Sequence, residues 1–108
     1  MMNRILSTTF LTLSLYAPVQ AEFMTGRTLL ARMNGDATDR ANAVGYIVGV
    51  ADSLMGTYSC PPHGLTSGQL AKQVKDVLEA NPERLMASAD VFVQSVMLQW
   101  PCSKKAVT

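Results

Sequence analysis

Residues 41–55 read ANAVGYIVGVADSLM, and the spacing of the apolar side chains in this stretch decides the fold. The apolar residues that set the spacing are Ala43, Ile47, Val50, Leu54 and, just beyond the stretch, Tyr58, with Val44, Val48, Ala51 and Met55 beside them. Steps of three and four residues are typical of an α-helix. Because the apolar surface is wide, we expect a central helix that other elements cover on most sides, with Asp36 or Asp39 as its N-cap.

The same stretch is too short to cross a membrane. Only about 11 uncharged residues separate Arg40 from Asp52, whereas a transmembrane helix needs about 20. Gly45 and Gly49 lie one helical turn apart, and each costs about 1 kcal/mol of helix propensity. The two glycines indicate a close approach by a neighbouring helix, which we expect to belong to the same chain. Contact with a second copy is the alternative.

Three further helices are predicted from their ends. Their N-caps are Thr25, Thr66 and Ser88, and Gln69 completes a capping box with Thr66. Their stop signals are Asn34–Gly35, Asn81–Pro82 and Pro101, and residues 82–88 form a connector with at most one helical turn. Apolar stripes run through Leu70, Val74, Val77 and Leu78 and through Ala89, Phe92, Val93, Val96, Met97 and Trp100. No stretch alternates as a strand does, so the sequence predicts an all-α fold, a compact bundle of about four helices.

Residues 1–21 have the organisation of a secretory signal peptide. Arg4 supplies the positive start, residues 5–16 are apolar, and Val19-Gln20-Ala21 places small residues at the cleavage site. We expect cleavage after Ala21, export, and a single domain over residues 22–108. The whole chain has a formal net charge of +1 at pH 7. Loss of Arg4 brings the charge to zero, which argues against nucleic acid or an anionic membrane as the partner.

Cys60 and Cys102 are the only cysteines, and both lie in the part expected to be exported. In an oxidising compartment, such a pair in a small domain forms a disulfide. The bond would close a loop of roughly 40 residues and, in the chain-entropy model, stabilise the fold by about 4 kcal/mol. It would also fasten the start of the segment from Cys60 to Leu65, which Pro61 and Pro62 already stiffen.

The sequence contains no recognisable catalytic or metal-binding set. Cys60 and His63 are close enough in sequence to suggest a thiol nucleophile and its base, but the expected disulfide removes the thiol. His63 is the only histidine, and neither a GxSxG motif nor a cluster of metal ligands is present. We therefore predict that the protein is not an enzyme and uses no metal or cofactor. Asp52, on a helix this apolar, is either a solvated or internally paired carboxylate or a contact for another protein.

Five segments occur in an order that is informative as a set: FMTGRTLL (residues 23–30), VGYIVGVAD (44–52), CPPHGLTSGQL (60–70), VLEANPE (77–83) and WPC (100–102). Together they resemble the Rap/Tai family of type VI secretion amidase immunity proteins. The resemblance implies a periplasmic, compact helical protein that commonly forms homodimers. It also implies a function, which is to bind a peptidoglycan amidase toxin of a type VI secretion system and occlude its active-site cleft. A small periplasmic chaperone of the acid-resistance type is the alternative function.

The expected contacts with a partner lie on segments that are both rigid and exposed, namely the loop at 60–65 and the connector at 81–86. The candidate contact residues are Pro61, Pro62, His63, Gly64, Glu83, Arg84 and Asp52. Met55 and Met86 are expected to be adaptable surface side chains. Members of the family commonly carry two further cysteines, at the positions that Met33 and Ala43 occupy here. We therefore expect packing alone to hold the first helix.

Overall fold

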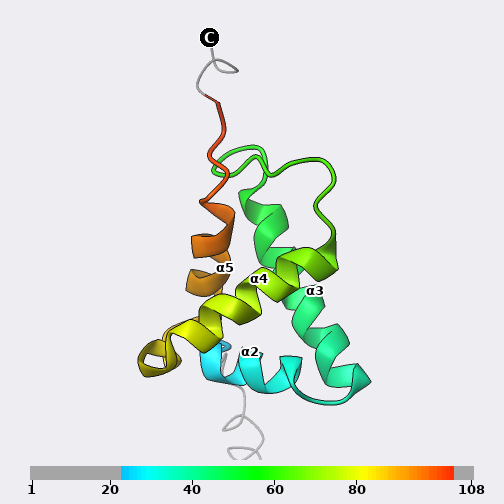
Figure 1. The fold of residues 1–108 in the computed structure, drawn as a ribbon, viewed down its shortest axis with the longest axis vertical. Helices are drawn as coiled ribbons and strands as arrows, with labels where there is room; N and C mark the ends of the chain where they lie inside the picture. The colour runs from blue at the N-terminus through cyan, green and yellow to red at the C-terminus, as the bar shows by residue number, and fades with distance from the viewer. Residues whose placement is uncertain (1–22, 104–108) are drawn as a thin grey trace, which may run out of the picture.

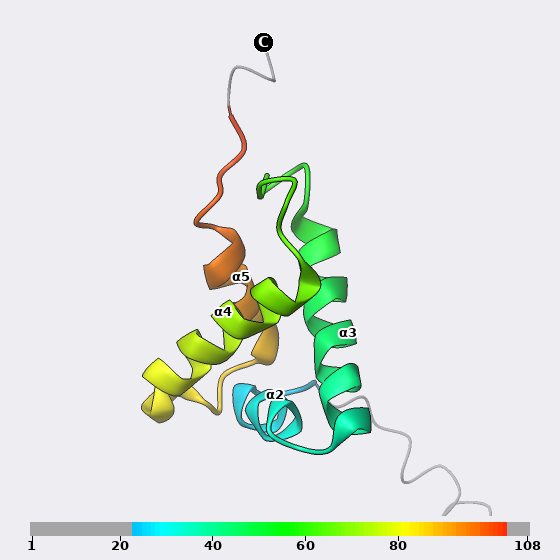
Figure 2. The same cartoon turned by 45° about the vertical axis from the view of Figure 1, so that its right-hand side comes forward.

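The computed structural model describes residues 23–103. This part of the chain contains four α-helices and one short 3₁₀ turn: α2 (Gly26–Met33), α3 (Ala37–Leu54), α4 (Ser67–Ala80), η1 (Pro82–Arg84) and α5 (Ala89–Met97). Figure 1 shows α3 and α5 upright, α4 crossing obliquely in front of them and α2 lying across the base. The turned view in Figure 2 agrees with this arrangement. The prediction of an all-α bundle of about four helices is confirmed.

Capping side chains begin the helices largely as expected. Asp36 caps α3 by accepting a hydrogen bond from the backbone N–H of Asp39 at 2.8 Å. Thr66 and Gln69 form the predicted capping box at the start of α4. Ser88 occupies the N-cap position of α5 but makes no capping bond, and its hydroxyl donates to the Asp90 carboxylate at 2.5 Å.

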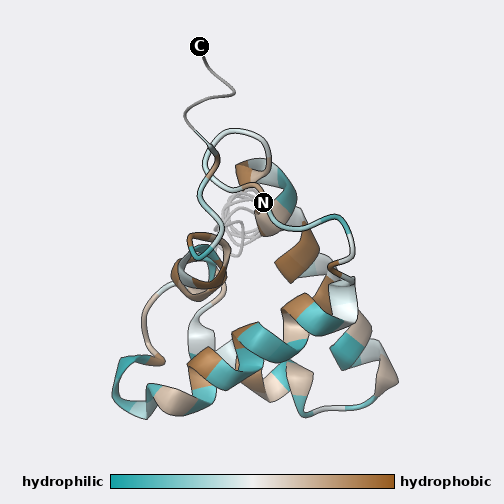
Figure 3. Cartoon of the chain, turned by 45° about the horizontal axis from the view of Figure 1, so that its top comes forward, coloured by the Kyte–Doolittle hydropathy of each residue, from teal (hydrophilic) through white to brown (hydrophobic). Residues whose placement is uncertain are grey.

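One continuous core fills the space between the four helices. Its buried members are Leu29 from α2, Ala43, Ile47 and Ala51 from α3, Leu70, Ala71, Val74 and Leu78 from α4, and Ala89, Phe92, Val93, Val96 and Met97 from α5. These residues include most of the predicted apolar stripes, and Figure 3 shows α4 with hydrophobic and hydrophilic positions on different sides. None of the helices within residues 23–103 is both long and apolar enough to span a bilayer.

The apolar spacing predicted for the central helix includes Tyr58, which lies beyond the end of the helix. Tyr58 continues the spacing, yet α3 ends at Leu54 and the Tyr58 side chain is 63% exposed. Gly56 adopts a positive φ of 83°, a conformation that ends the helix and turns the chain. The N–H of Gly56 then donates to the carbonyl of Ser59 at 2.8 Å. The inclusion of Tyr58 in the buried stripe was therefore wrong.

The expectation that Gly45 and Gly49 mark a close approach by another helix of the same chain is also wrong. A Cβ atom built on either residue has no other atom within 4 Å, and both lie on the exposed face of α3. The close approach occurs at Gly26 instead. A Cβ there would lie 2.6 Å from the Phe92 ring and 3.2 Å from the carbonyl oxygen of Leu85. The glycine that permits close packing between helices is therefore in α2, not in α3.

We expect Gly49→Ala to stabilise the monomer by about 0.5–1 kcal/mol, because alanine favours the helix and the new methyl group meets only solvent. Urea denaturation monitored by circular dichroism measures this difference. A loss of stability, or a loss of self-association, would contradict the assignment of this face as open and would indicate a second copy packed against it.

The same substitution at Gly26 should have the opposite effect. Gly26→Ala forces a methyl group against Phe92 and the Leu85 carbonyl, and we expect a loss of about 1–3 kcal/mol in the free energy of unfolding. The comparison with Gly49→Ala in the same denaturation assay removes the shared effect of helix propensity. Equal effects at the two positions would show that the Gly26 contact is not a constraint.

Backbone hydrogen bonds also fix α2. The N–H of Gly26 donates to Ala87 at 2.9 Å, the N–H of Arg27 donates to Leu85 at 2.8 Å, and the N–H of Ala89 donates to Met24 at 2.8 Å. The start of α2 is therefore tied to the segment that precedes α5, in addition to packing against α3, α4 and α5. The prediction that packing alone holds the first helix was wrong, since these three bonds join segments distant in sequence.

Candidate functional site

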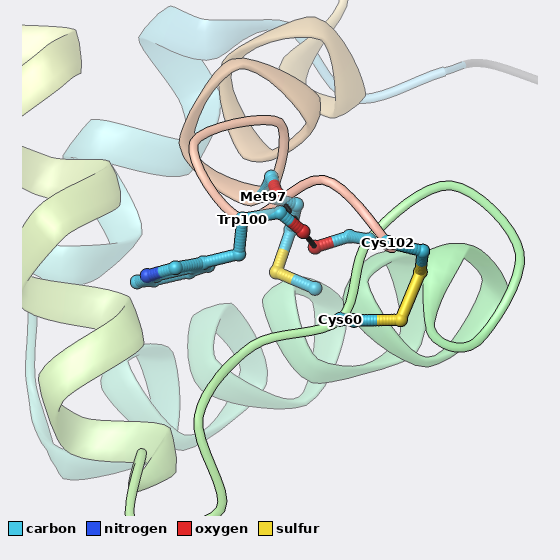
Figure 4. The surroundings of a disulfide bond; sticks show 5 residues. Cys60, Met97, Trp100 and Cys102 are labelled. Carbon is cyan, nitrogen blue, oxygen red and sulfur yellow. Dashed lines mark hydrogen bonds between the residues drawn. A yellow bond between two sulfur atoms is a disulfide. The ribbon is translucent and has the colours of Figure 1, made fainter. Parts of the chain in front are cut away.

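The predicted disulfide is present. Cys60 and Cys102 are joined with an S–S distance of 2.04 Å and a Cα–Cα distance of 4.8 Å. Figure 4 shows how the bond links the segment that follows α3 to the segment that follows α5. The C-terminal ends of these two helices are therefore held together covalently at one end of the bundle.

Hydrogen bonds around Ser59 strengthen the same junction. Ser59 is completely buried, and its hydroxyl donates to the carbonyl of Met97 at 2.5 Å. The N–H of Cys60 donates to the carbonyl of Trp100 at 2.7 Å. The Met97 carbonyl also accepts from the N–H of Trp100 at 3.2 Å, so these bonds together fix the turn that follows α5. The root of the loop at 60–65 is thus fixed by hydrogen bonds as well as by sulfur.

From this root the loop projects outward as a tight turn. The N–H of Leu65 donates to the carbonyl of Pro62 at 3.2 Å, which closes the turn around His63 and Gly64. Both of these central residues are exposed. Figures 1 and 2 show the loop beside the C-terminal segment, at the top of the molecule. A stiff, exposed loop was predicted here, and the described geometry agrees with that expectation.

A groove of about 480 Å³ lies on one side of this loop. It is lined by Val48, Ala51, Asp52, Met55, Gly56, Ser59, Cys60, Pro61, Pro62, His63, Leu65, Thr66, Ser67, Leu70 and Met97. The lining therefore combines the C-terminal half of α3, the loop, the start of α4 and the end of α5. We call this hollow the Asp52 groove, after the one acidic residue in its lining.

Four of the predicted contact residues, Asp52, Pro61, Pro62 and His63, meet at the Asp52 groove. Gly64 borders a neighbouring hollow on the other side of the loop, which Trp100 also lines. Figure 4 shows the Trp100 ring directed away from the disulfide toward α4.

Glu83 and Arg84 do not join this group. They lie in η1, beyond the opposite end of α4, and a 14-residue helix is roughly 20 Å long.

The sequence did not predict the groove or most of the residues that line it. Leu70 and Met97 were predicted only as core residues, and both also line the groove. Met55 was expected at the surface and is 51% exposed, but its place beside Asp52 was not foreseen. Met86, at 64% exposure, is likewise at the surface. The exposed methionine three residues after Asp52 is the one sequence signal that pointed to this site.

The groove is suited to binding. Asp52 and His63 carry the only carboxylate and the only imidazole in its lining, and Cys60 is held in the disulfide. Within residues 23–103, no three histidine, cysteine or acidic side chains gather in a way that would hold a metal ion.

Outside the groove, the pKa of one side chain is shifted. Burial, with a smaller contribution from the Asp90 carboxylate, raises the pKa of Tyr46, so this phenol stays neutral at physiological pH.

These features describe a small, disulfide-bonded helical protein with an apolar groove beside a rigid loop, an arrangement suited to contact with another protein. A sequence model of the Rap1a immunity proteins matches residues 25–102, almost all of the described chain. The protein therefore belongs to the Rap1a immunity protein family. Its function within that family is the recognition of a cognate toxin. A comparison with curated proteins gave no match.

Proposed function

We propose that this protein acts in the periplasm as the immunity protein of a type VI secretion system, and that it binds a peptidoglycan amidase toxin and occludes its active-site cleft. The observation that carries the proposal is the gathering of Asp52, Pro61, Pro62 and His63 around one groove and one rigid loop. Family membership supports the immunity role. The loop is the convex element that enters the amidase cleft, and the groove receives the surface beside that cleft.

The rigidity of the loop favours this mode of inhibition. Binding costs conformational entropy for each segment that becomes ordered, and a segment that is already ordered avoids this cost. The disulfide, the buried Ser59 hydroxyl and the closed Pro62–Leu65 turn order the loop before any partner arrives. Glu83 and Arg84 form a separate surface on η1, so we place them outside this contact.

The experiment is carried out in a bacterial host that exports a type VI amidase to its periplasm and lyses as a result. Co-production of the full chain should restore growth. The same chain without residues 1–21, which lie outside the described residues, should fail to protect because it stays in the cytoplasm. Lysis in the presence of the full chain, for every amidase tested, would contradict the proposal. Protection by the chain without residues 1–21 would contradict the periplasmic location.

The acid-resistance chaperone makes a different prediction in the same host. A chaperone would protect unrelated periplasmic proteins from aggregation at low pH and would form no stoichiometric complex with an amidase. Light scattering of unrelated proteins at low pH, with and without this protein, therefore separates the two functions. We expect no suppression of aggregation.

We also propose that the protein forms a homodimer through the edge where α3 and α5 run together. A hollow of about 350 Å³ there is lined by Leu54, Tyr58, Gln94 and Leu98. Tyr58 is 63% exposed and Leu98 is 57% exposed, which is costly for large apolar side chains in water. This patch lies apart from the Asp52 groove, with which it shares no residue, so a dimer would leave both grooves free.

Leu98→Asp should convert the dimer to a monomer, because a carboxylate would be buried without a partner at the centre of the interface. Sedimentation equilibrium measures the change, with a weakening of self-association expected at roughly 100-fold. Val91→Asp serves as the control, since Val91 is also exposed on α5 but does not line this hollow. A Leu98→Asp protein that remains dimeric would contradict the interface.

A further inference from the structure

The carboxylate of Asp52 makes no ion pair or hydrogen bond with any other residue of the described chain, 23–103. Three of the other four aspartates in residues 23–103 have such partners: Asp36 caps α3, Asp76 pairs with Lys72 at 3.3 Å, and Asp90 accepts from Ser88. The carboxylate of Asp39 has none, but Asp39 lies in the first turn of α3, where a negative charge is favourable. Asp52 is exposed at the rim of the groove. The sequence left open a solvated carboxylate, an internal pair or a contact with another protein, and the structure removes the internal pair.

The position of Asp52 within α3 is unfavourable for the stability of the free protein. It lies in the last turn of the helix, which ends at Leu54 and contains no basic residue. The carbonyl groups at the C-terminal end of a helix carry partial negative charge, so a carboxylate there is repelled. Asp52 therefore gains no partner from the fold, and its exposed carboxylate is available to another molecule.

The surroundings of Asp52 specify what it would contact. The groove is lined with apolar surface from Met55, Pro61, Leu65 and Met97, and it contains no second acidic residue and no lysine or arginine. Thr66 and Ser67 at the start of α4 also line the groove, and the N–H of Thr66 donates to the Gln69 side chain at 2.9 Å. Asp52 therefore gives the groove its negative charge.

We propose that the Asp52 groove receives an apolar segment of the toxin that carries a lysine or arginine, and that this cation pairs with Asp52. The argument is charge complementarity, because a carboxylate beside desolvated apolar surface gains most from a cation brought by the partner. The proposal rests on the proposed function, since it names the part of the toxin that this site recognises.

The test compares Asp52→Asn with Glu79→Gln in the full chain. Glu79 is the matched control, because it is also an exposed acidic residue in the last turn of a helix and does not line the groove. Affinity for the amidase that the wild-type protein inhibits is measured by calorimetry at low and at high sodium chloride. Thermal denaturation of the free proteins is measured alongside.

Asp52→Asn should weaken amidase binding by roughly 10- to 100-fold at low salt and reduce the salt dependence of the affinity. It should also raise the melting temperature of the free protein by roughly 2–4 °C, because the repulsion at the helix end is removed. Glu79→Gln should give a similar rise in melting temperature and leave the affinity unchanged. A purely structural role for Asp52 would instead lower the melting temperature.

Unchanged affinity of Asp52→Asn for an amidase that the wild type still inhibits would overturn this inference and leave the proposed function intact. If no amidase binds the wild-type protein, both the inference and the proposed function fail.

The experiments also distinguish two other possible occupants of the groove, the chain's own terminus and a second copy. Tighter amidase binding after substitution of both Lys104 and Lys105 by glutamine would show that the chain's own terminus occupies the groove, and a changed oligomeric state of Asp52→Asn would show a second copy. Either result overturns the inference.

Discussion

Replacing Cys60 and Cys102 together by alanine is expected to lower the free energy of unfolding by about 4 kcal/mol. The bond spans a sequence separation of 42 residues, and without it the unfolded chain regains the conformational freedom that this link removes. A loss of this size lowers the melting temperature of a domain of this length by roughly 15–30 °C. Thermal and urea denaturation, followed by circular dichroism, measure both quantities.

The native structure of the double variant should persist at low temperature. The Ser59 hydroxyl still donates to Met97 and the Cys60 position still donates its N–H to Trp100, so the end of α5 remains docked beside the root of the loop. Ser59→Ala with the disulfide intact is a useful comparison, because it removes the buried hydrogen bond alone. A double-alanine variant within about 1 kcal/mol of the wild type would contradict the account, since the disulfide would then contribute little.

Met55→Lys is expected to weaken binding of the amidase by roughly 100-fold or more. Met55 is 51% exposed and lines the Asp52 groove, so the free protein should accept the lysine with little change in stability. In the complex, the ammonium group would be desolvated on apolar surface. It would also lie near Asp52, where it would neutralise the carboxylate and repel a cation on the partner.

Met86→Lys is the control for this substitution. Met86 is 64% exposed and follows η1, at the far end of α4 from the groove. The same change of side chain there should leave the affinity within about twofold of the wild type. Calorimetry with the amidase measures both variants. An equal loss of affinity for Met86→Lys would contradict a contact centred on the groove. It would indicate that the connector, with Glu83 and Arg84, also contacts the amidase.

Much of the fold followed from local rules in the sequence. Helix starts depend on short-range hydrogen bonds, so Thr25 and Thr66 identified two of them directly. The start of α3 was predicted at Asp36 or Asp39, and Asp36 is the cap. The periodic apolar residues of α4 and α5 identified the buried faces, because burial follows helical spacing. The disulfide followed from the number of cysteines and the expected compartment.

The errors came from features that depend on tertiary position. Gly26 and Gly49 look alike in the sequence, and only the packing of Phe92 against α2 separates a required glycine from an exposed one. The hydroxyl of Ser88 donates to Asp90 and accepts no helix N–H, and a capping rule alone does not predict this orientation.

The groove was beyond reach for the same reason. Its lining draws on the end of α3, the loop, the start of α4 and Met97, and sequence spacing carries no information on how these segments converge. The stiffness of the loop was nevertheless predicted from Pro61 and Pro62, since the restriction that proline places on the backbone is a local property.

The most direct test of the central claim is a titration of amidase activity. A purified type VI peptidoglycan amidase is mixed with increasing amounts of the oxidised protein, residues 22–108, and hydrolysis of peptidoglycan stem peptides is followed by mass spectrometry. The account predicts that activity falls linearly and reaches zero when each amidase molecule has one copy of this protein. Full hydrolysis in the presence of a stoichiometric complex would contradict occlusion of the active site.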